Sequence, residues 1–193
     1  MSNFHGLPAE YLAAKFIGPK RTLELDDVDC LWAARGILGE GGPHVDDETM
    51  GAYLWAILRR CLLMPNTLSY GAMWQAFSQP INPKWRADGK FCKPGGAYCG
   101  RAECDPSRLA RRERFASMHW DKIPTQIAGH VLAFGMGLIY APKITEIKQV
   151  KISNWASYPG VEEKFPWGLD IGGEWFFEDQ NLLDGDIKSQ VIQ

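Results

Sequence analysis

Apolar side chains recur every three or four residues through the first two thirds of the chain, and this spacing predicts helices. The clearest stripe follows Asp46 and Asp47, and consists of Met50, Tyr53, Leu54, Ile57, Leu58, Cys61 and Leu62. One of these two aspartates should cap the helix, because a carboxylate there accepts a hydrogen bond from a free backbone N–H. The helix should end before Pro65, since the residue that precedes a proline disfavours helical geometry.

Four further helices are predicted, one before this stripe and three after it. The first covers residues 26–38 and carries Cys30, Ala33 and Ile37 on one face. Asn66 and Thr67 are expected to cap the helix that follows Pro65, which carries Tyr70, Met73, Trp74 and Phe77. A basic helix is expected over residues 107–118, and a last one from about Pro124 to Phe134 with Ile127 and Val131 on its inner face.

The remaining segments have a different character. Residues 78–105 break the helical spacing and predict a long loop, which in a compact domain is usually functional or disordered. After Pro142 the pattern favours short strands, over residues 144–152 and 175–177. The expected fold is therefore α+β, mainly α, in one domain. Residues 1–25 would form an N-terminal extension, and residues 184–193 a flexible polar tail.

Composition supports this picture and excludes some partners. With 193 residues, of which 46% are hydrophobic, the chain can bury the core of a single domain. A net charge of −2 gives no general reason to expect nucleic acid as a partner. Arginines do gather locally, which indicates either a solvated helix face or an anion-binding patch; they are Arg101, Arg108, Arg111, Arg112 and Arg114.

No segment approaches the roughly 20 apolar residues that span a bilayer, so we expect no membrane insertion. The beginning of the sequence also lacks the pattern of a signal peptide. The sequence therefore predicts a soluble product made in the cytoplasm, which another route must carry to any target outside it.

The chain has five cysteines, an odd number that argues against a full disulfide framework. Cys30 and Cys61 fall on apolar helical stripes and should be buried thiols. Cys92, Cys99 and Cys104 follow a C-x6-C-x4-C spacing within the predicted loop. Three interpretations stay open for them: a zinc site completed by His119, a disulfide formed after export, or free thiols. No other cofactor is indicated.

Glu40 is the most informative residue for function. It stands where the first helix stops and a Gly41–Gly42 turn begins. If the helix persists, the face of Cys30 and Ile37 continues to Glu40, and desolvation there would raise the pKa of its carboxyl and keep it protonated as a general acid. The alternative is that Glu40 only ends a helix.

Several motifs resemble the cell-wall hydrolase family typified by spore-cortex-lytic enzymes (SleB-like). They occur in the family's order over residues 28–177. They are Ala33-Ala34-Arg35-Gly36-Ile37-Leu38-Gly39-Glu40-Gly41-Gly42, Ile57-Leu58-Arg59-Arg60, Pro65-Asn66-Thr67, Gln75-Ala76-Phe77-Ser78-Gln79-Pro80-Ile81-Asn82-Pro83 and Ile171-Gly172-Gly173-Glu174-Trp175-Phe176-Phe177. Two positions differ from the family pattern, because Leu58 replaces an Asn and Glu174 replaces a His or Asn.

The resemblance implies a lysozyme-like fold and cleavage of peptidoglycan between N-acetylmuramic acid and N-acetylglucosamine, commonly as a lytic transglycosylase. The family's catalytic acid corresponds to Glu40. The Cys92–Cys104 insertion and the basic helix look like those of phage-encoded relatives. The expected partners are therefore peptidoglycan strands and other proteins of a virion, in a protein that acts at genome entry or at lysis. A non-catalytic virion component with the same fold is the competing interpretation.

The resemblance also suggests substrate-binding residues in the third helix and in the segment that follows it. Its candidate residues are Tyr70, Gln75, Ser78, Gln79, Asn82 and Trp85. Polar side chains there can bind sugar hydroxyls, and Trp85 or Tyr70 can stack on a sugar face. The alternative is a proline-stiffened connector whose polar groups bind its own backbone.

A glycosidase that hydrolyses its substrate needs a second carboxylate, about 5–5.5 Å or 6.5–9.5 Å from the first. The nearest in sequence are Asp46, Asp47 and Glu48, but the start of a helix explains all three. With Glu40 as a lone acid, the sequence favours a lytic transglycosylase over a hydrolysing muramidase, because the attacking hydroxyl then belongs to the substrate.

Overall fold

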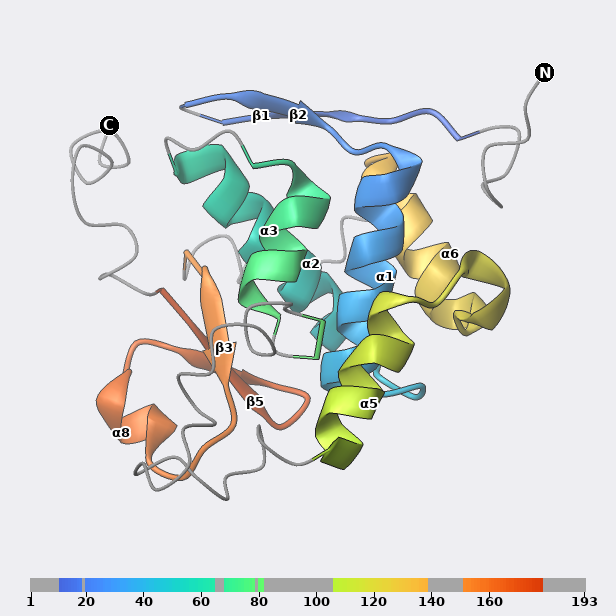
Figure 1. The fold of residues 1–193 in the computed structure, drawn as a ribbon. Coiled ribbons are helices and arrows are strands. Elements are labelled where there is room, and N and C mark those ends of the chain that lie inside the picture. The colour runs from blue at the N-terminus through green and yellow to red at the C-terminus, as the bar shows by residue number, and fades with distance from the viewer. Residues whose placement is uncertain are drawn as a thin grey trace.

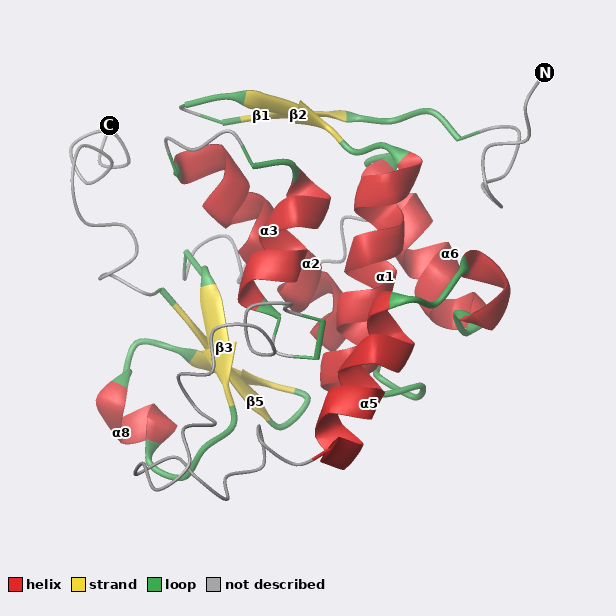
Figure 2. Ribbon diagram, viewed as in Figure 1, coloured by secondary structure: helices red, strands yellow, loops and turns green. Residues whose placement is uncertain are grey.

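The computed structural model describes residues 11–18, 20–64, 68–78, 80–81, 106–138 and 151–178. Helices predominate among them and the strands are short, so the predicted α+β, mainly α class is confirmed (Figure 2). Some predictions lie outside the described residues, namely those for Gln79, Asn82, Trp85, Cys92, Cys99, Cys104, residues 144–150 and the tail 184–193.

Helices α1 (Asp27–Gly41) and α2 (Asp47–Leu63) follow the predicted stripes. Each begins with an aspartate cap: Asp26 accepts a hydrogen bond from Asp29 N at 2.8 Å, and Asp46 accepts one from Thr49 N at 2.9 Å. These bonds satisfy amides that have no partner within the helix. Helix α1 extends beyond residue 38, and Glu40 therefore lies on its last turn.

Helix α3 (Tyr70–Phe77) begins later than predicted. Its cap is Ser69, whose Oγ accepts a hydrogen bond from Ala72 N at 3.2 Å, so the assignment of Asn66 and Thr67 as caps was wrong. A contact with α1 explains this start, because Gly71 N donates to the buried Asp29 Oδ1 at 2.6 Å. This bond fixes the first turn of α3 against α1.

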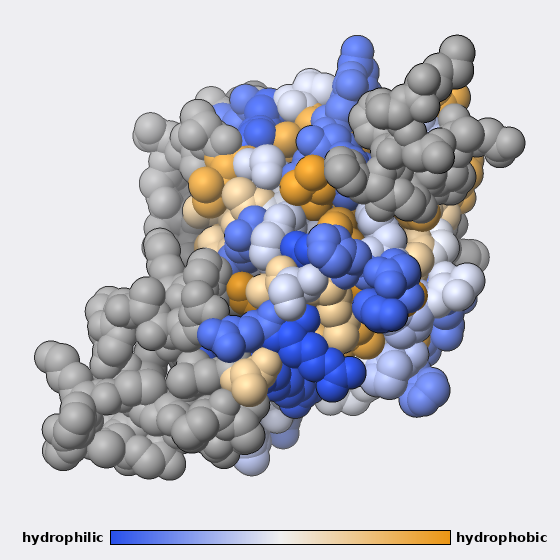
Figure 3. All heavy atoms as spheres, turned by 45° about the vertical axis from the view of Figure 1, so that its right-hand side comes forward, coloured by the Kyte–Doolittle hydropathy of each residue, from blue (hydrophilic) through white to orange (hydrophobic). Residues whose placement is uncertain are grey.

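Helix α5 (Pro106–Ala116), the short 3-10 helix η2 (Trp120–Lys122) and helix α6 (Thr125–Gly135) complete the helical part. Ile127, Val131 and Phe134 of α6 are buried as predicted. On α5, Arg111 and Arg114 are exposed but Arg112 is buried, so these arginines do not form one continuous solvated face. Hydrophilic side chains gather below the centre of the view in Figure 3, at the level of α5.

An antiparallel hairpin of β1 (Lys15–Ile17) and β2 (Thr22–Glu24) precedes the helices. Its residue Phe16 stacks on Phe134 of α6, with ring centroids 5.5 Å apart, and Leu23 is buried in the core. Part of the predicted N-terminal extension therefore packs on the domain.

The second sheet has the antiparallel order β3-β5-β4, formed by β3 (Asn154–Ala156), β4 (Leu169–Ile171) and β5 (Glu174–Phe177). The prediction of a strand at 175–177 is confirmed, whereas residues 151 and 152 are not in a strand. Helix α8 (Val161–Lys164) lies between β3 and β4 in sequence. In Figure 1 this sheet and α8 stand on one side of the helices, and the β1–β2 hairpin crosses their opposite end.

The core lies between α1 and the helices packed around it, and it extends through α2 to the three-stranded sheet. Tyr53 of α2 meets Trp155 of β3 and Phe176 of β5, with ring centroids 5.0 and 5.2 Å away. Cys30 and Cys61 are buried free thiols, as predicted. Among the residues described, no helix is both long enough and apolar enough to cross a bilayer.

Candidate active site

Glu40 lies on the last turn of α1 and is partly exposed. Its Oε1 accepts a hydrogen bond of 2.9 Å from the hydroxyl of Ser78, the residue that ends α3. Ser78 is fully buried. The structure thus joins two residues that the sequence singled out, but Ser78 contacts the acid rather than open space where a sugar would lie.

Two glycines of α1 explain why the ends of the helices are so close. A Cβ on Gly36 would lie 2.2 Å from the ring of Trp74, and one on Gly39 would lie 2.4 Å from Pro80 Cβ. Any larger side chain would push α1 away from α3 and from the residues after it. The glycines therefore permit the approach that brings Glu40 to Ser78.

Tyr53 of α2 lies beside the same end of α1. A Cβ on Gly41 would meet the Tyr53 ring at 3.5 Å. The Tyr53 side chain is fully buried, and its hydroxyl has no hydrogen bond of ordinary geometry with the described residues. Burial raises the pKa of this hydroxyl, and so do the negative charges of Glu174, Glu40 and Asp46. The hydroxyl is therefore surrounded by acidic side chains.

Glu174 is the carboxyl that acts most strongly on Tyr53, and it comes from the opposite end of the chain. Successive side chains of a strand point to opposite faces, so Glu174 shares the face of Phe176, which packs on Tyr53. Glu174 is half-buried. Burial raises the pKa of its carboxyl, and the nearby Tyr53 hydroxyl lowers it by a smaller amount.

The turn between β4 and β5 fixes this position of Glu174. Gly172 and Gly173 have φ values of 63° and 82°, which favour glycine. A Cβ on Gly172 would lie 2.0 Å from Thr49 Oγ1 and 3.0 Å from Asp46 Oδ2. The turn therefore presses against the first turn of α2, and Asp170 supports it by accepting a hydrogen bond of 3.0 Å from Gly173 N.

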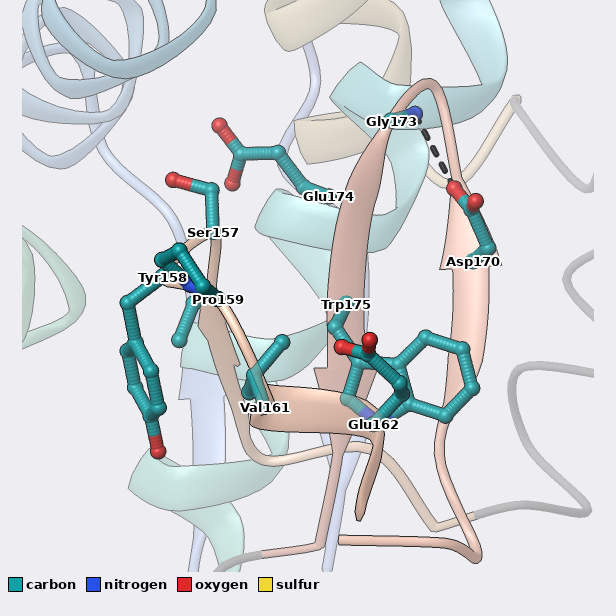
Figure 4. A pocket seen from close by; sticks show the side chains of 10 residues that line it. Ser157, Tyr158, Pro159, Val161, Glu162, Asp170, Gly173, Glu174 and Trp175 are labelled. Carbon is teal, nitrogen blue, oxygen red and sulfur yellow. Dashed lines mark hydrogen bonds between the residues drawn. The ribbon is translucent and has the colours of Figure 1, made fainter. Parts of the chain in front are cut away.

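An open pocket of about 460 Å³ adjoins Glu174. Its walls are formed by Ala156, Ser157, Tyr158, Pro159, Val161, Glu162, Asp170, Gly173, Glu174 and Trp175. Figure 4 shows the Glu174 carboxylate and the Ser157 hydroxyl turned to the same side of the sheet, with Asp170 bonded to Gly173 on the other side. Ser157 follows β3 directly, and the strand register places it opposite Glu174.

The structure does not support Tyr70 as a platform for a sugar ring. Its side chain is fully buried, and its hydroxyl donates to Leu54 O at 2.8 Å, so no face is open for stacking. The prediction failed because an aromatic residue on a helical stripe fits a core as well as a cleft. Gln75 is half-buried on α3, one turn before Ser78.

The acids at the start of α2 have the structural roles expected of them. Asp46 accepts hydrogen bonds from the backbone and hydroxyl of Thr49. Burial would raise its pKa, but these bonds outweigh it and leave the pKa lowered. Asp47 is largely exposed and lies 3.7 Å from His130 Nδ1. Glu48 belongs to the first helical turn.

A zinc site is not visible in the part of the chain that the structure covers. No group of three or more histidine, cysteine, aspartate or glutamate side chains is arranged there to hold a metal ion. His119 precedes η2, while its three possible cysteine partners lie outside the described residues. The zinc hypothesis stays a prediction.

Comparison of this chain with family models, with curated proteins and with solved structures finds no match. The chemistry of the site must therefore be inferred from its own residues. Glu174 was not among the candidate residues predicted from the sequence, although it stood out as a Glu at a position where the resemblance leads one to expect His or Asn.

Proposed function

We propose that this protein is a peptidoglycan lytic transglycosylase, which cleaves between N-acetylmuramic acid and N-acetylglucosamine with Glu40 as its acid. The observation that carries the proposal is the hydrogen bond from Ser78 to Glu40 Oε1 at the ends of two packed helices. It holds a partly exposed carboxyl in one orientation at the edge of the core. A general acid requires such a fixed position within reach of its substrate.

The reaction needs little beyond this acid. Protonation of the glycosidic oxygen by Glu40 breaks the bond to the anomeric carbon. The C6 hydroxyl of the muramic acid unit then attacks that carbon and closes an anhydro ring, and a carboxylate of the site accepts its proton. Because the nucleophile belongs to the substrate, one acid can serve both steps.

The resemblance to SleB-like hydrolases supports the substrate assignment. Glu40, Ser78 and Glu174 all fall within the motifs that carry the resemblance. Ser78 bonds to Glu40, and the charges of Glu40 and Glu174 both act on Tyr53. The same resemblance supports a phage-associated role, either in the virion or at lysis, with peptidoglycan strands as the partner.

A specific observation also favours a second candidate, a hydrolysing muramidase. Glu174 is a second carboxyl near the site, which the sequence did not reveal. Hydrolysis would leave reducing ends, whereas lytic transglycosylation leaves anhydro ends.

The test is the clearing of purified peptidoglycan, measured by turbidity, for the wild type and for Glu40→Gln. We expect a loss of at least about 100-fold, the usual contribution of a general acid. Glu48→Gln removes a neighbouring carboxyl of α2 and should retain activity. Equal activity of the wild type and Glu40→Gln would contradict the role of Glu40. No activity in either would favour a non-catalytic component. Mass spectrometry of the products distinguishes anhydro from reducing ends.

A further inference from the structure

We propose that Glu174 is a second catalytic carboxyl, which takes the proton of the attacking hydroxyl while Glu40 protonates the leaving oxygen. This inference rests on the proposed function and deepens it. The site would then contain both an acid, Glu40 of α1, and a base, Glu174 of β5, instead of a single acid.

The strand register determines where Glu174 points. Glu174 pairs with Ile171 across β4 and β5, and Phe176 pairs with Leu169 and with Trp155. Paired residues of antiparallel strands share a face. Since Trp155 and Phe176 both pack on Tyr53, Glu174 lies on the face turned to α2.

Tyr53 links the two carboxyls. Its ring lies beside Gly41 at the end of α1, where an added Cβ would be 3.5 Å away, and the charges of both Glu174 and Glu40 act on its buried hydroxyl. Burial raises the pKa of the Glu174 carboxyl, and the Tyr53 hydroxyl beside it opposes that shift by favouring the ionised form that a base requires.

The other charged groups around the site do not compete for these roles. Asp46 on α2 is held by Thr49, and Asp170 on β4 by Gly173 N. Glu162 on α8 is exposed on the pocket wall. The Arg111 guanidinium of α5 donates to Gly39 O at 3.4 Å, close to Glu40.

Glu40 and Glu174 are thus the two carboxyls left for the roles of acid and base. In the proposed division, Glu40 donates a proton to the leaving oxygen and Glu174 accepts one from the attacking hydroxyl.

The proposed step is balanced. The glycosidic bond breaks as the proton of Glu40 moves to the leaving oxygen. The bond between the C6 oxygen and the anomeric carbon forms as the hydroxyl proton moves to Glu174. Exchange of one proton between each carboxyl and solvent restores the starting state. The pocket of about 460 Å³ beside Glu174 lies in the size range of small-molecule sites and leaves room for a sugar unit.

The test is the pH profile of kcat/KM on purified glycan strands for the wild type and Glu174→Gln. A base loses function below its pKa, so the wild type should show a limb of falling activity on the acidic side. Glu174→Gln should lower kcat/KM by at least about 100-fold and abolish this limb. Glu162→Gln, which alters another carboxyl of the same pocket, should change neither. Circular dichroism verifies that each variant is folded.

If Glu174→Gln does not fold, Glu174→Asp provides the same measurement, because it keeps a carboxylate but shortens its reach. It should retain the acidic limb at a reduced rate. A variant with kcat/KM within twofold of wild type and an unchanged pH profile would overturn the inference while leaving the proposed function intact. A wild type that releases no glycan fragments would overturn both.

Discussion

The Ser78 hydroxyl donates a 2.9 Å hydrogen bond to Glu40 Oε1 and so joins the end of α3 to the end of α1. Ser78 is buried, whereas Glu40 is partly exposed. The bond therefore connects the core to the surface at the residue that we propose to be the acid. Its removal should affect activity more than folding.

Ser78→Ala tests this difference. Loss of one hydrogen bond should lower the free energy of unfolding by about 1 kcal/mol. Glycan cleavage should fall about tenfold or more, because the orientation of Glu40 is no longer fixed. Ser69→Ala is the matched control, since it removes the cap at the other end of α3 for about 1 kcal/mol. Equal activity losses in the two variants would show that Ser78 acts only through helix stability.

Gly36→Ala tests the close packing of α1 on α3. The new methyl group would start 2.2 Å from the Trp74 ring, and such overpacking costs about 1–3 kcal/mol of unfolding free energy. Gly129→Ala on α6 is the control, because a Cβ there has no atom within 4 Å. It should stabilise the protein by about 1 kcal/mol through helix propensity. Chemical denaturation measures both, and a neutral Gly36→Ala would contradict the described packing.

Gly172→Ala tests whether the β4–β5 turn positions Glu174. The substitution adds both strain at positive φ and a contact of 2.0 Å with Thr49 Oγ1. Gly173→Ala adds strain alone, about 1–2 kcal/mol, because no atom lies within 4 Å. Cleavage activity should therefore fall much further in Gly172→Ala. If Gly172→Ala and Gly173→Ala had similar cleavage activities under conditions in which both are folded, the turn would not position Glu174 for catalysis.

Glu174→Gln should make the protein more stable at neutral pH. Burial raises the folded-state pKa of Glu174 above its ordinary value of 4.5, so ionisation of this group opposes folding. The folded state binds the proton of Glu174 more tightly than the unfolded state does. The stability that this proton contributes is present below pH 4.5 and is lost as pH rises through the folded-state pKa. Thermal melting at two pH values measures this. A higher melting temperature of the variant should be visible at pH 7 and absent near pH 4.

The predictions succeeded where local patterns decide the structure. The stripe of α2 and the capping role of Asp46 needed only helical spacing and a carboxylate at the first turn. The cap of α3 was misassigned because Asn66, Thr67 and Ser69 are all suitable, and only the contact of Gly71 with Asp29 selects the last.

The site was partly predictable for a related reason. Glu40 and Ser78 were singled out through the order of family motifs, and their contact follows from glycines that no pattern of apolar residues identifies. The position of Glu174 depends on a hairpin that folds back on α2 from far along the chain. Tyr70 was misjudged because burial, not residue type, decides whether an aromatic ring can meet a ligand.

The stacking of Phe16 on Phe134 has a practical consequence for making shorter versions of this protein. A boundary drawn at Asp26 would follow the start of the first long helix and discard the β1–β2 hairpin. It would uncover one face of the Phe134 ring and remove Leu23 and Leu25 from the core. The shortened chain would present a new apolar surface and tend to self-associate. The working unit for expression, labelling or fusion therefore starts before the hairpin.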